Sequence, residues 1–191
     1  MSQEGFERNV QELLTSVEIC LKSGLRLPAL LVLYAGIDIM AWLNRPSGQT
    51  DVQRRDFIAW VEKYLLPNSG LRCNALELFA ARCGLLHSYT SQSRLSRVGN
   101  ARQIFYAFGS AKPEELQSLI DATGTIPAVA LQLEELLDAF GRGLKKFKDA
   151  LSRDTQHAAL VYRRAGEWYV AEDKKELAEA VGRLRRFYKG K

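Results

Sequence analysis

Residues 27–43, Leu-Pro-Ala-Leu-Leu-Val-Leu-Tyr-Ala-Gly-Ile-Asp-Ile-Met-Ala-Trp-Leu, form an apolar run with a single charge, Asp38, at its centre. A run of 17 residues is at the short limit for crossing a bilayer, and an acid inside the membrane is costly. A helix that is apolar nearly all round is instead typical of the centre of a soluble bundle. We therefore predict that this run is the central helix of a helical bundle.

Amphipathic helices are expected on both sides of this run. Residues 3–23 place apolar side chains mostly three or four positions apart and end at Gly24, where a helix C-cap glycine belongs. A third helix is expected from Asp51 to Leu65, and a fourth over residues 74–88. Short connections between these four helices predict an antiparallel up-and-down bundle.

The middle of the chain is less helical in character. Residues 88–101 are polar and rich in serine and arginine, which is typical of a loop. Residues 102–108 are aromatic enough for a β-strand, although a helical turn is also compatible with them. A short helix with acids in its first turn is expected over residues 112–121.

The last third of the chain predicts a long helix and then a hairpin. Residues 125–153 keep an amphipathic pattern, and residues 158–171 have the pattern of a β-hairpin that turns at Ala165-Gly166. This hairpin and residues 102–108 could form a three-stranded sheet against the bundle. A final helix is expected over residues 174–188.

The overall prediction is a mainly α fold, an antiparallel helical bundle with a small β-hairpin or sheet near the C-terminus. Residues 1–153 would form the bundle, and residues 154–191 would pack on it as a hairpin and a basic helix. Residues 1–141 carry 13 basic and 15 acidic side chains, whereas residues 142–191 carry 14 and 7. A basic region on a near-neutral body permits binding to nucleic acid, and a solvated cationic helix face is the alternative.

Composition narrows the function classes. Charged residues make up 26% and hydrophobic residues 47%, which are ordinary globular values. The three cysteines, Cys20, Cys73 and Cys83, lack metal-ligand spacing, and two histidines 70 residues apart do not make a zinc set. No glycine-rich phosphate loop occurs, so neither a metal nor a cofactor is expected. The N-terminus lacks the features of a signal peptide, and we expect a cytoplasmic protein.

Residues 74–91, Asn-Ala-Leu-Glu-Leu-Phe-Ala-Ala-Arg-Cys-Gly-Leu-Leu-His-Ser-Tyr-Thr-Ser, join a buried helix to a polar loop. No carboxylate occurs from Leu78 to Pro113, and His87 is one of only two histidines. Five basic side chains lie in the same acid-free segment: Arg82, Arg94, Arg97, Arg102 and Lys112. This segment is a reasonable place for a phosphate, and Arg94, Arg97 and Arg102 are the candidate RNA-binding residues.

Arg82-Cys-Gly-Leu-Leu-His87 is an arginine followed by four residues and a histidine. It resembles the Arg-x(4–6)-His motif of the HEPN superfamily, small helical-bundle proteins of which many are metal-independent endoribonucleases of toxin–antitoxin and defence systems. The resemblance covers roughly residues 3–153, and Cys83 stands where many members carry Asn, Asp or His. It implies acid–base catalysis by His87, phosphate binding by Arg82 and a supporting acid, Asp38. Two further polar residues are candidates to support the site: Ser88 and Tyr89.

In such a reaction the RNA 2′-hydroxyl attacks the adjacent phosphorus and leaves a 2′,3′-cyclic phosphate. Five positions along an ideal helix turn about 140° around its axis, so Arg82 and His87 would not share a face. The helix must then break near Gly84 or end before His87, or the site is assembled across a dimer, as is common in HEPN proteins. We expect a homodimer through residues 82–90, with an antitoxin or a nucleotidyltransferase as a possible partner.

Structural roles are the alternatives for the same residues. His87 could cap the end of a helix, and Arg82 could pair with Glu77 or Asp38. Asp38 could be a core-facing acid that an arginine satisfies. The function would then be that of a non-catalytic helical scaffold, an antitoxin-like interaction subunit or a nucleotide-binding bundle.

Overall fold

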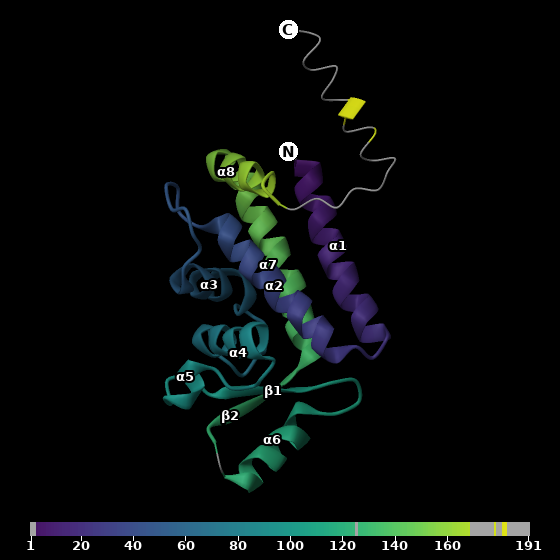
Figure 1. The fold of residues 1–191 in the computed structure, drawn as a ribbon, viewed down its shortest axis with the longest axis vertical. Helices are drawn as coiled ribbons and strands as arrows, with labels where there is room; N and C mark the ends of the chain where they lie inside the picture. The colour runs from purple at the N-terminus through teal and green to yellow at the C-terminus, as the bar shows by residue number, and fades with distance from the viewer. Residues whose placement is uncertain (1–2, 125, 169–177, 179–180, 183–191) are drawn as a thin grey trace.

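Helix α2 (Arg26–Asn44) lies in the middle of the fold, and helices α1 (Gln3–Lys22) and α7 (Leu133–Arg153) run alongside it (Figure 1). The computed structural model describes residues 3–124, 126–168, 178 and 181–182. Only three residues join α1 to α2, so α2 returns directly along α1. The apolar run over residues 27–43 is therefore confirmed as a central helix.

A second group of helices packs on the other side of α2. Helix α3 (Arg54–Trp60) continues into a π-helix, η1 (Val61–Leu65), and helix α4 (Ala75–Ser88) lies beside α3 (Figure 1). The fully buried Trp60 joins this group to α7, because its ring centroid lies 5.9 Å from that of Phe140 and 6.2 Å from that of Phe147. Aromatic pairs at such distances contribute more than their buried area alone.

The end of α4 is followed by a short helix, α5 (Arg94–Arg97), and then by a parallel βαβ unit. Strand β1 (Gln103–Ala107) leads through helix α6 (Pro113–Thr123) to strand β2 (Ala128–Gln132). Gln103 pairs with Ala128 and Ala107 with Gln132 in a parallel register. The predicted strand at 102–108 and the helix at 112–121 are thus confirmed in the structure.

The predicted helix over residues 125–153 is wrong at its beginning. Residues 128–132 form β2, and α7 starts directly after it at Leu133. The continuous apolar run there fits a strand that is buried on both faces, since Ala128, Val129, Ala130 and Leu131 are all buried. A long connection through α6 explains why the two strands are parallel, because parallel neighbours need a crossover and cannot be joined by a tight turn.

The predicted C-terminal hairpin is also wrong. Residues 155–165 form helix α8 (Thr155–Ala165), and the sheet contains β1 and β2 without any strand from this region. The Asp154 side chain caps α8 by accepting a hydrogen bond from the His157 amide at 2.9 Å. Val161 and Ala165 are buried four positions apart, which is helical spacing. The predicted strand over 169–171 and most of the predicted helix over 174–188 lie outside the described residues.

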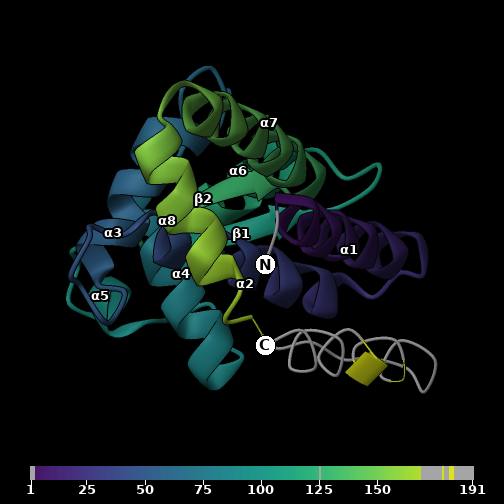
Figure 2. The same cartoon turned by 90° about the horizontal axis from the view of Figure 1, so that it is seen from above.

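Helix α8 lies over one end of the bundle, in contact with α1, α2 and α7 (Figure 2). Arg164 is buried and donates hydrogen bonds to the carbonyl oxygens of Leu43, Arg45 and Pro46, at the end of α2. A basic side chain from the region predicted to be a cationic surface is therefore used to hold the bundle together.

By length and composition, α2 would also pass for a membrane span. Half of its apolar window is buried inside the protein, and Leu33, Ile37 and Leu43 are fully buried against other helices. Packing in the bundle therefore accounts for the hydropathy of α2 without a membrane.

Candidate functional site around Arg82 and His87

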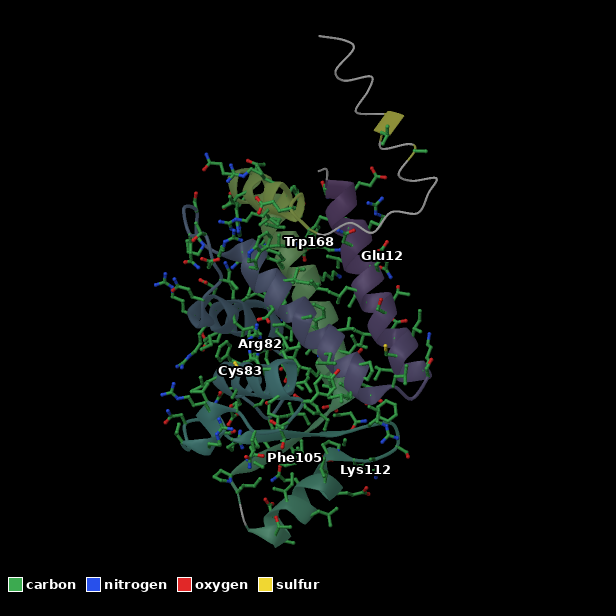
Figure 3. The ribbon with its side chains drawn as sticks, in the orientation of Figure 1. Glu12, Arg82, Cys83, Phe105, Lys112 and Trp168 are labelled. Atoms are coloured by element: carbon green, nitrogen blue, oxygen red, sulfur yellow. The ribbon has the colours of Figure 1, made fainter. Side chains whose placement is uncertain are left out.

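Arg82 on α4 is held by Asp38 on α2. The Nε and Nη2 atoms of Arg82 both lie 2.5 Å from Oδ2 of Asp38, and about a fifth of each side chain is exposed. Figure 3 shows Arg82 and Cys83 in the middle of α4, on the side of the fold where α3 and α4 lie. The pairing of Arg82 with Asp38, one of the alternatives predicted for both residues, is confirmed.

Partial burial and mutual attraction act on this ion pair in opposite directions. Burial raises the pKa of Asp38, and the hydrogen bond and charge of Arg82 oppose that rise without cancelling it. Burial by itself would lower the pKa of Arg82, but the hydrogen bond to Asp38 and the charge of that carboxylate outweigh it and the pKa is raised. The guanidinium therefore stays charged and is fixed in place by the carboxyl group.

His87 lies next to the same guanidinium within one chain. Its Nε2 atom is 3.2 Å from Nη1 of Arg82, and the histidine side chain is exposed. Because an arginine only donates, Nε2 accepts in this contact and the ring proton is on Nδ1. The expectation that these two residues need a helix break or a second chain to meet is wrong.

Arg82 and His87 can meet because the angle between two positions on a helix fixes only the directions of their Cα–Cβ bonds. It does not fix where the end of a long side chain lies. Helix α4 continues through Gly84 and His87 to Ser88. Asp38 fixes the far end of the long Arg82 side chain, and that end lies beside the His87 ring. The contact is therefore made by the tip of Arg82 and not by the faces of the helix.

Gly84 is in the helix because the following loop folds back onto it. A Cβ atom at Gly84 would lie 2.7 Å from the carbonyl oxygen of Thr90 and 3.0 Å from that of Gln92. Tyr89 ends the helix in the left-handed region, at φ 55°, and its amide bonds to the carbonyls of Gly84 and Leu85. Gly84 thus lets the loop approach closely and does not break the helix as predicted.

Ser88 and Tyr89, the two candidate supporting residues, have different surroundings. The Ser88 hydroxyl donates to the Gly84 carbonyl at 2.9 Å and lies 3.0 Å from the Thr90 hydroxyl. The Tyr89 side chain is 62% exposed, and its backbone adopts the left-handed conformation that is uncommon for a bulky residue. Ser88 therefore belongs to the helix end, whereas Tyr89 is free to contact a ligand or another chain.

Cys83 occupies the position after the arginine. Its sulfur is 4.0 Å from Nη1 of Arg82, and it is a free, half-buried thiol. A thiol is a weak hydrogen-bond partner compared with the amide, carboxylate or imidazole that the motif carries in many HEPN proteins. Cys83 adds little to the polarity of the site.

The three candidate RNA-binding arginines do not form one group. Arg94 and Arg97 lie on α5 and are exposed. Arg102 instead donates from Nε to the buried carboxylate of Glu77 at 2.6 Å and from Nη2 to the carbonyl of Arg72 at 2.9 Å. Burial alone would raise the pKa of Glu77, but hydrogen bonds from Arg102 and the Asn74 amide lower it overall.

Several basic residues of the C-terminal region are engaged with the bundle. Lys148 pairs with Glu7 on α1, and Lys146 donates to the Pro67 carbonyl at 2.6 Å. Arg164 is buried at the end of α2. The positive charge of residues 142–168 is therefore partly structural, and the rest of the basic region lies outside the described residues.

A second feature, for which the sequence carries no pattern, is a cavity of about 310 Å³ between α2, α4 and β1. Its lining comes from Leu30 and Tyr34 of α2, Ala81 and Leu85 of α4, and the strand residues around Tyr106. Spacing along the chain gives no signal for it, because its walls are brought together only by the packing of three distant segments. We refer to it as the Arg26 cavity, after the cation that borders it.

The part of the chain that the structure describes offers no metal site. No three side chains of the His, Cys, Asp and Glu types come together among these residues in a way that could hold an ion. The groups that the Arg82 site itself presents are the guanidinium, the imidazole of His87 and the carboxylate of Asp38.

Arg82, His87 and Asp38 lie together although they come from two different helices. Asp38 comes from a helix 44 positions earlier, so the three side chains form a site that only folding assembles. No protein-family model, curated protein or solved structure was found to match this chain, so its functional assignment depends on the geometry of these residues.

Proposed function

We propose that the protein is a HEPN-like, metal-independent endoribonuclease that cleaves RNA by transesterification at Arg82 and His87. The observation that carries this proposal is the contact of 3.2 Å between Nη1 of Arg82 and Nε2 of His87, with Asp38 holding the guanidinium from behind. A phosphate bound to Arg82 would therefore have an acid–base group beside it.

The hydrogen bonds of Arg82 leave donors for a phosphate. A guanidinium has five N–H groups, and Asp38 takes one from Nε and one from Nη2. His87 accepts one from Nη1, so one N–H on Nη1 and one on Nη2 remain. These two N–H groups are the donors that we assign to two non-bridging oxygens of one phosphate.

The reaction then needs only groups that RNA and this site supply. The 2′-oxygen forms a bond to phosphorus while the bond from phosphorus to the 5′-oxygen breaks, which gives a 2′,3′-cyclic phosphate and a free 5′-hydroxyl. Nε2 of His87 exchanges its contact with Nη1 of Arg82 for the attacking 2′-hydroxyl as the phosphate binds, and it then takes the proton of that hydroxyl. An imidazolium returns a proton to the leaving 5′-oxygen. Arg82 stabilises the negative charge that builds up on the phosphate.

We further propose that the enzyme is a homodimer through residues 82–90. A second copy would bring a second His87, so that one imidazole acts as base while the other acts as acid. The exposed Tyr89 supports this choice, since a large aromatic side chain that is 62% exposed at the edge of a site suits an interface. Arg94 and Arg97 on the neighbouring α5 are exposed and would contact the RNA backbone.

The biological setting belongs to the same proposal. We place the activity in the cytoplasm, as part of a toxin–antitoxin or defence system in which an antitoxin or a nucleotidyltransferase restrains the nuclease. A gene for such a partner beside the gene for this chain would support the setting. Expression in a bacterial host without the partner should then slow growth, and His87→Ala should relieve that effect.

The central test is cleavage of labelled RNA by the purified protein in EDTA. The parent should produce fragments ending in a 2′,3′-cyclic phosphate, and an RNA with 2′-deoxyribose at the cut position should stay intact. His87→Ala should lower the rate by about 10²–10⁴-fold, the range for a lost acid–base group. Arg82→Lys should lower it by about 10²-fold or more, because an ammonium cannot replace the fork.

The chain offers a matched control in its second histidine. His157 lies on α8, at the far end of the bundle from β1 and β2 (Figure 1), so His157→Gln should cleave as the parent does. Cleavage that persists in both His87→Ala and Arg82→Lys would disprove the assignment. A mass measurement that shows only monomer at micromolar concentration would rule out the proposal that His87 residues of two copies act together.

A binding role without cleavage is the second candidate. It is favoured by the ion pair that already engages Arg82 and by the thiol of Cys83 next to it. In that case intact RNA should bind with a strong dependence on salt, and Arg94→Gln with Arg97→Gln should reduce that dependence. A scaffold or an antitoxin-like subunit would show neither cleavage nor binding of RNA.

A further inference from the structure

The Arg26 cavity lies apart from the contact between Arg82 and His87. Its walls contain the buried Leu30 and Leu85 and the strand residue Ile104, so its interior is apolar. A volume of about 310 Å³ is at the lower end of the range for small-molecule sites. The cavity is therefore large enough for a small ligand and too small for a folded partner.

Polar atoms in the wall are largely satisfied by one another. The hydroxyl groups of Tyr34 and Tyr106 form a hydrogen bond with each other. Burial raises the pKa of both tyrosines, so these hydroxyls stay protonated and uncharged. The two residues thus present aromatic rings to the cavity and add no charge to it.

The only charge among the described lining residues is that of Arg26, at the first turn of α2. Its guanidinium carbon lies 4.5 Å from the centre of the Phe108 ring, which also lines the cavity, so the cation is held at the edge. Arg26 has no carboxylate partner in the described structure, and no acid lines the cavity. A ligand with one negative charge would match this arrangement.

Exposed apolar groups flank the same edge. Leu27 is 36% exposed and Tyr89 is 62% exposed, and both are among the lining residues. Exposed apolar surface at the rim of an apolar cavity is what a bound molecule would cover. Helix α2 also begins without a side-chain cap, and its positive end adds to the attraction for an anion.

We propose that the Arg26 cavity binds a small monoanion with an apolar body, such as a medium-chain carboxylate. The carboxylate pairs with the guanidinium of Arg26, and the hydrocarbon lies between α2, α4 and β1. This proposal does not depend on RNA cleavage, since neither Arg82 nor His87 lines the cavity.

The test is titration calorimetry of the full chain with octanoate and with its uncharged counterpart, octanol. Octanoate should bind saturably with one molecule per chain and at least tenfold more tightly than octanol. Arg26→Gln should weaken octanoate binding by about tenfold or more and leave octanol binding unchanged. A matched arginine on α1, Arg8, is exposed and outside the cavity, so Arg8→Gln should bind both as the parent does.

A second variant tests the cavity itself. Ala81 lines it from α4, so Ala81→Phe should fill the space and abolish binding of both molecules. Ala122→Phe places the same ring on the exposed surface of α6 and should leave binding intact. The circular dichroism spectrum of Ala81→Phe should match that of the parent. If the spectra differ, the affinity of Arg26→Gln for octanoate is the result that tests the proposal.

Three outcomes would overturn the proposal. Equal affinity for octanoate and octanol would show that Arg26 does not select an anion. Binding of several molecules without saturation would mean adventitious contact with exposed apolar surface. The third outcome is a parent chain that binds neither molecule and forms a dimer, whereas Leu27→Asp is monomeric. That result would mean that a second copy covers the cavity. His87→Ala should bind octanoate normally, which separates this site from the proposed nuclease.

Discussion

Asp38 has a role that its position in an apolar helix does not suggest at first. Alone among the Leu27–Leu43 side chains it is charged, and its carboxylate takes two N–H groups of Arg82. Removing one partner of a partly buried pair leaves the other without compensation, so both residues should be sensitive to substitution. The ion pair also orients the guanidinium toward His87, which links a packing feature of the core to the candidate chemistry.

The second histidine allows a prediction about pH. Burial lowers the pKa of His157, with Asp154 opposing the shift and the charges of Lys63 and Arg164 adding to it. The unfolded chain, with an ordinary histidine pKa of about 6.5, then binds more protons than the folded chain just below that pH. Stability should therefore fall as the pH drops through this window.

The measurement is urea unfolding of the parent and His157→Gln at pH 8 and at pH 5. The parent should lose more stability between the two pH values than the variant does, because only the parent has to protonate this imidazole on unfolding. Equal losses in both proteins would contradict the assignment.

At the scale of elements, the end of α4 is shaped by a close approach between a helix and its own loop. A Cβ atom at position 84 would lie only 2.7 Å from the carbonyl oxygen of Thr90 and 3.0 Å from that of Gln92. The loop between α4 and α5 is thereby pulled onto α4 and sets the position of Tyr89. Both the candidate nuclease site and the Arg26 cavity border this loop.

Gly84→Ala should therefore destabilise the protein although alanine favours helices. We expect a loss of about 1–3 kcal/mol in the free energy of unfolding, because backbone oxygens cannot move aside as a flexible side chain can. Gly141, in the middle of α7, has open space within 4 Å of the position that an alanine methyl group would take, so Gly141→Ala should stabilise by about 0.5–1 kcal/mol. Denaturant unfolding of both variants checks the opposite signs.

At the scale of the whole molecule, one arginine joins the C-terminal helix to the central one. Arg164 on α8 is 4% exposed and donates to the carbonyl groups of Leu43, in the last turn of α2, and of Arg45 and Pro46, directly after it. Burial lowers the pKa of Arg164, and the nearby charges of Arg45 and Arg163 lower it further. The carbonyl oxygens of Leu43, Arg45 and Pro46 compensate by surrounding the buried guanidinium with acceptors.

Arg164→Met should therefore lower the free energy of unfolding by about 3 kcal/mol or more, because it leaves three carbonyl groups without their charged donor. The neighbouring Arg163 is exposed, and Arg163→Met should change stability by no more than about 0.5 kcal/mol. Thermal unfolding of the two variants gives a direct comparison. Similar values for both would mean that α8 adds little to the stability of the bundle.

Much of the helical part of this fold was predictable because it depends on local pattern. The spacing of apolar residues predicted α1, α2 and α4 to within a few residues, and aromatic residues predicted β1. The pattern was misleading where a segment is short and apolar. Residues 128–132 became a strand and residues 155–165 a helix, since the partner that each segment packs against decided between the two structures.

The sequence by itself determined the central helix α2, the helices around it and the two residues, Arg82 and His87, that make a phosphate site conceivable. Only the tertiary structure decided that these residues touch, since their contact depends on an acid 44 positions earlier in the chain. It also decided the parallel order of β1 and β2 and created the Arg26 cavity. Periodicity reports which face of an element is apolar, but it carries no information about which distant face will cover it.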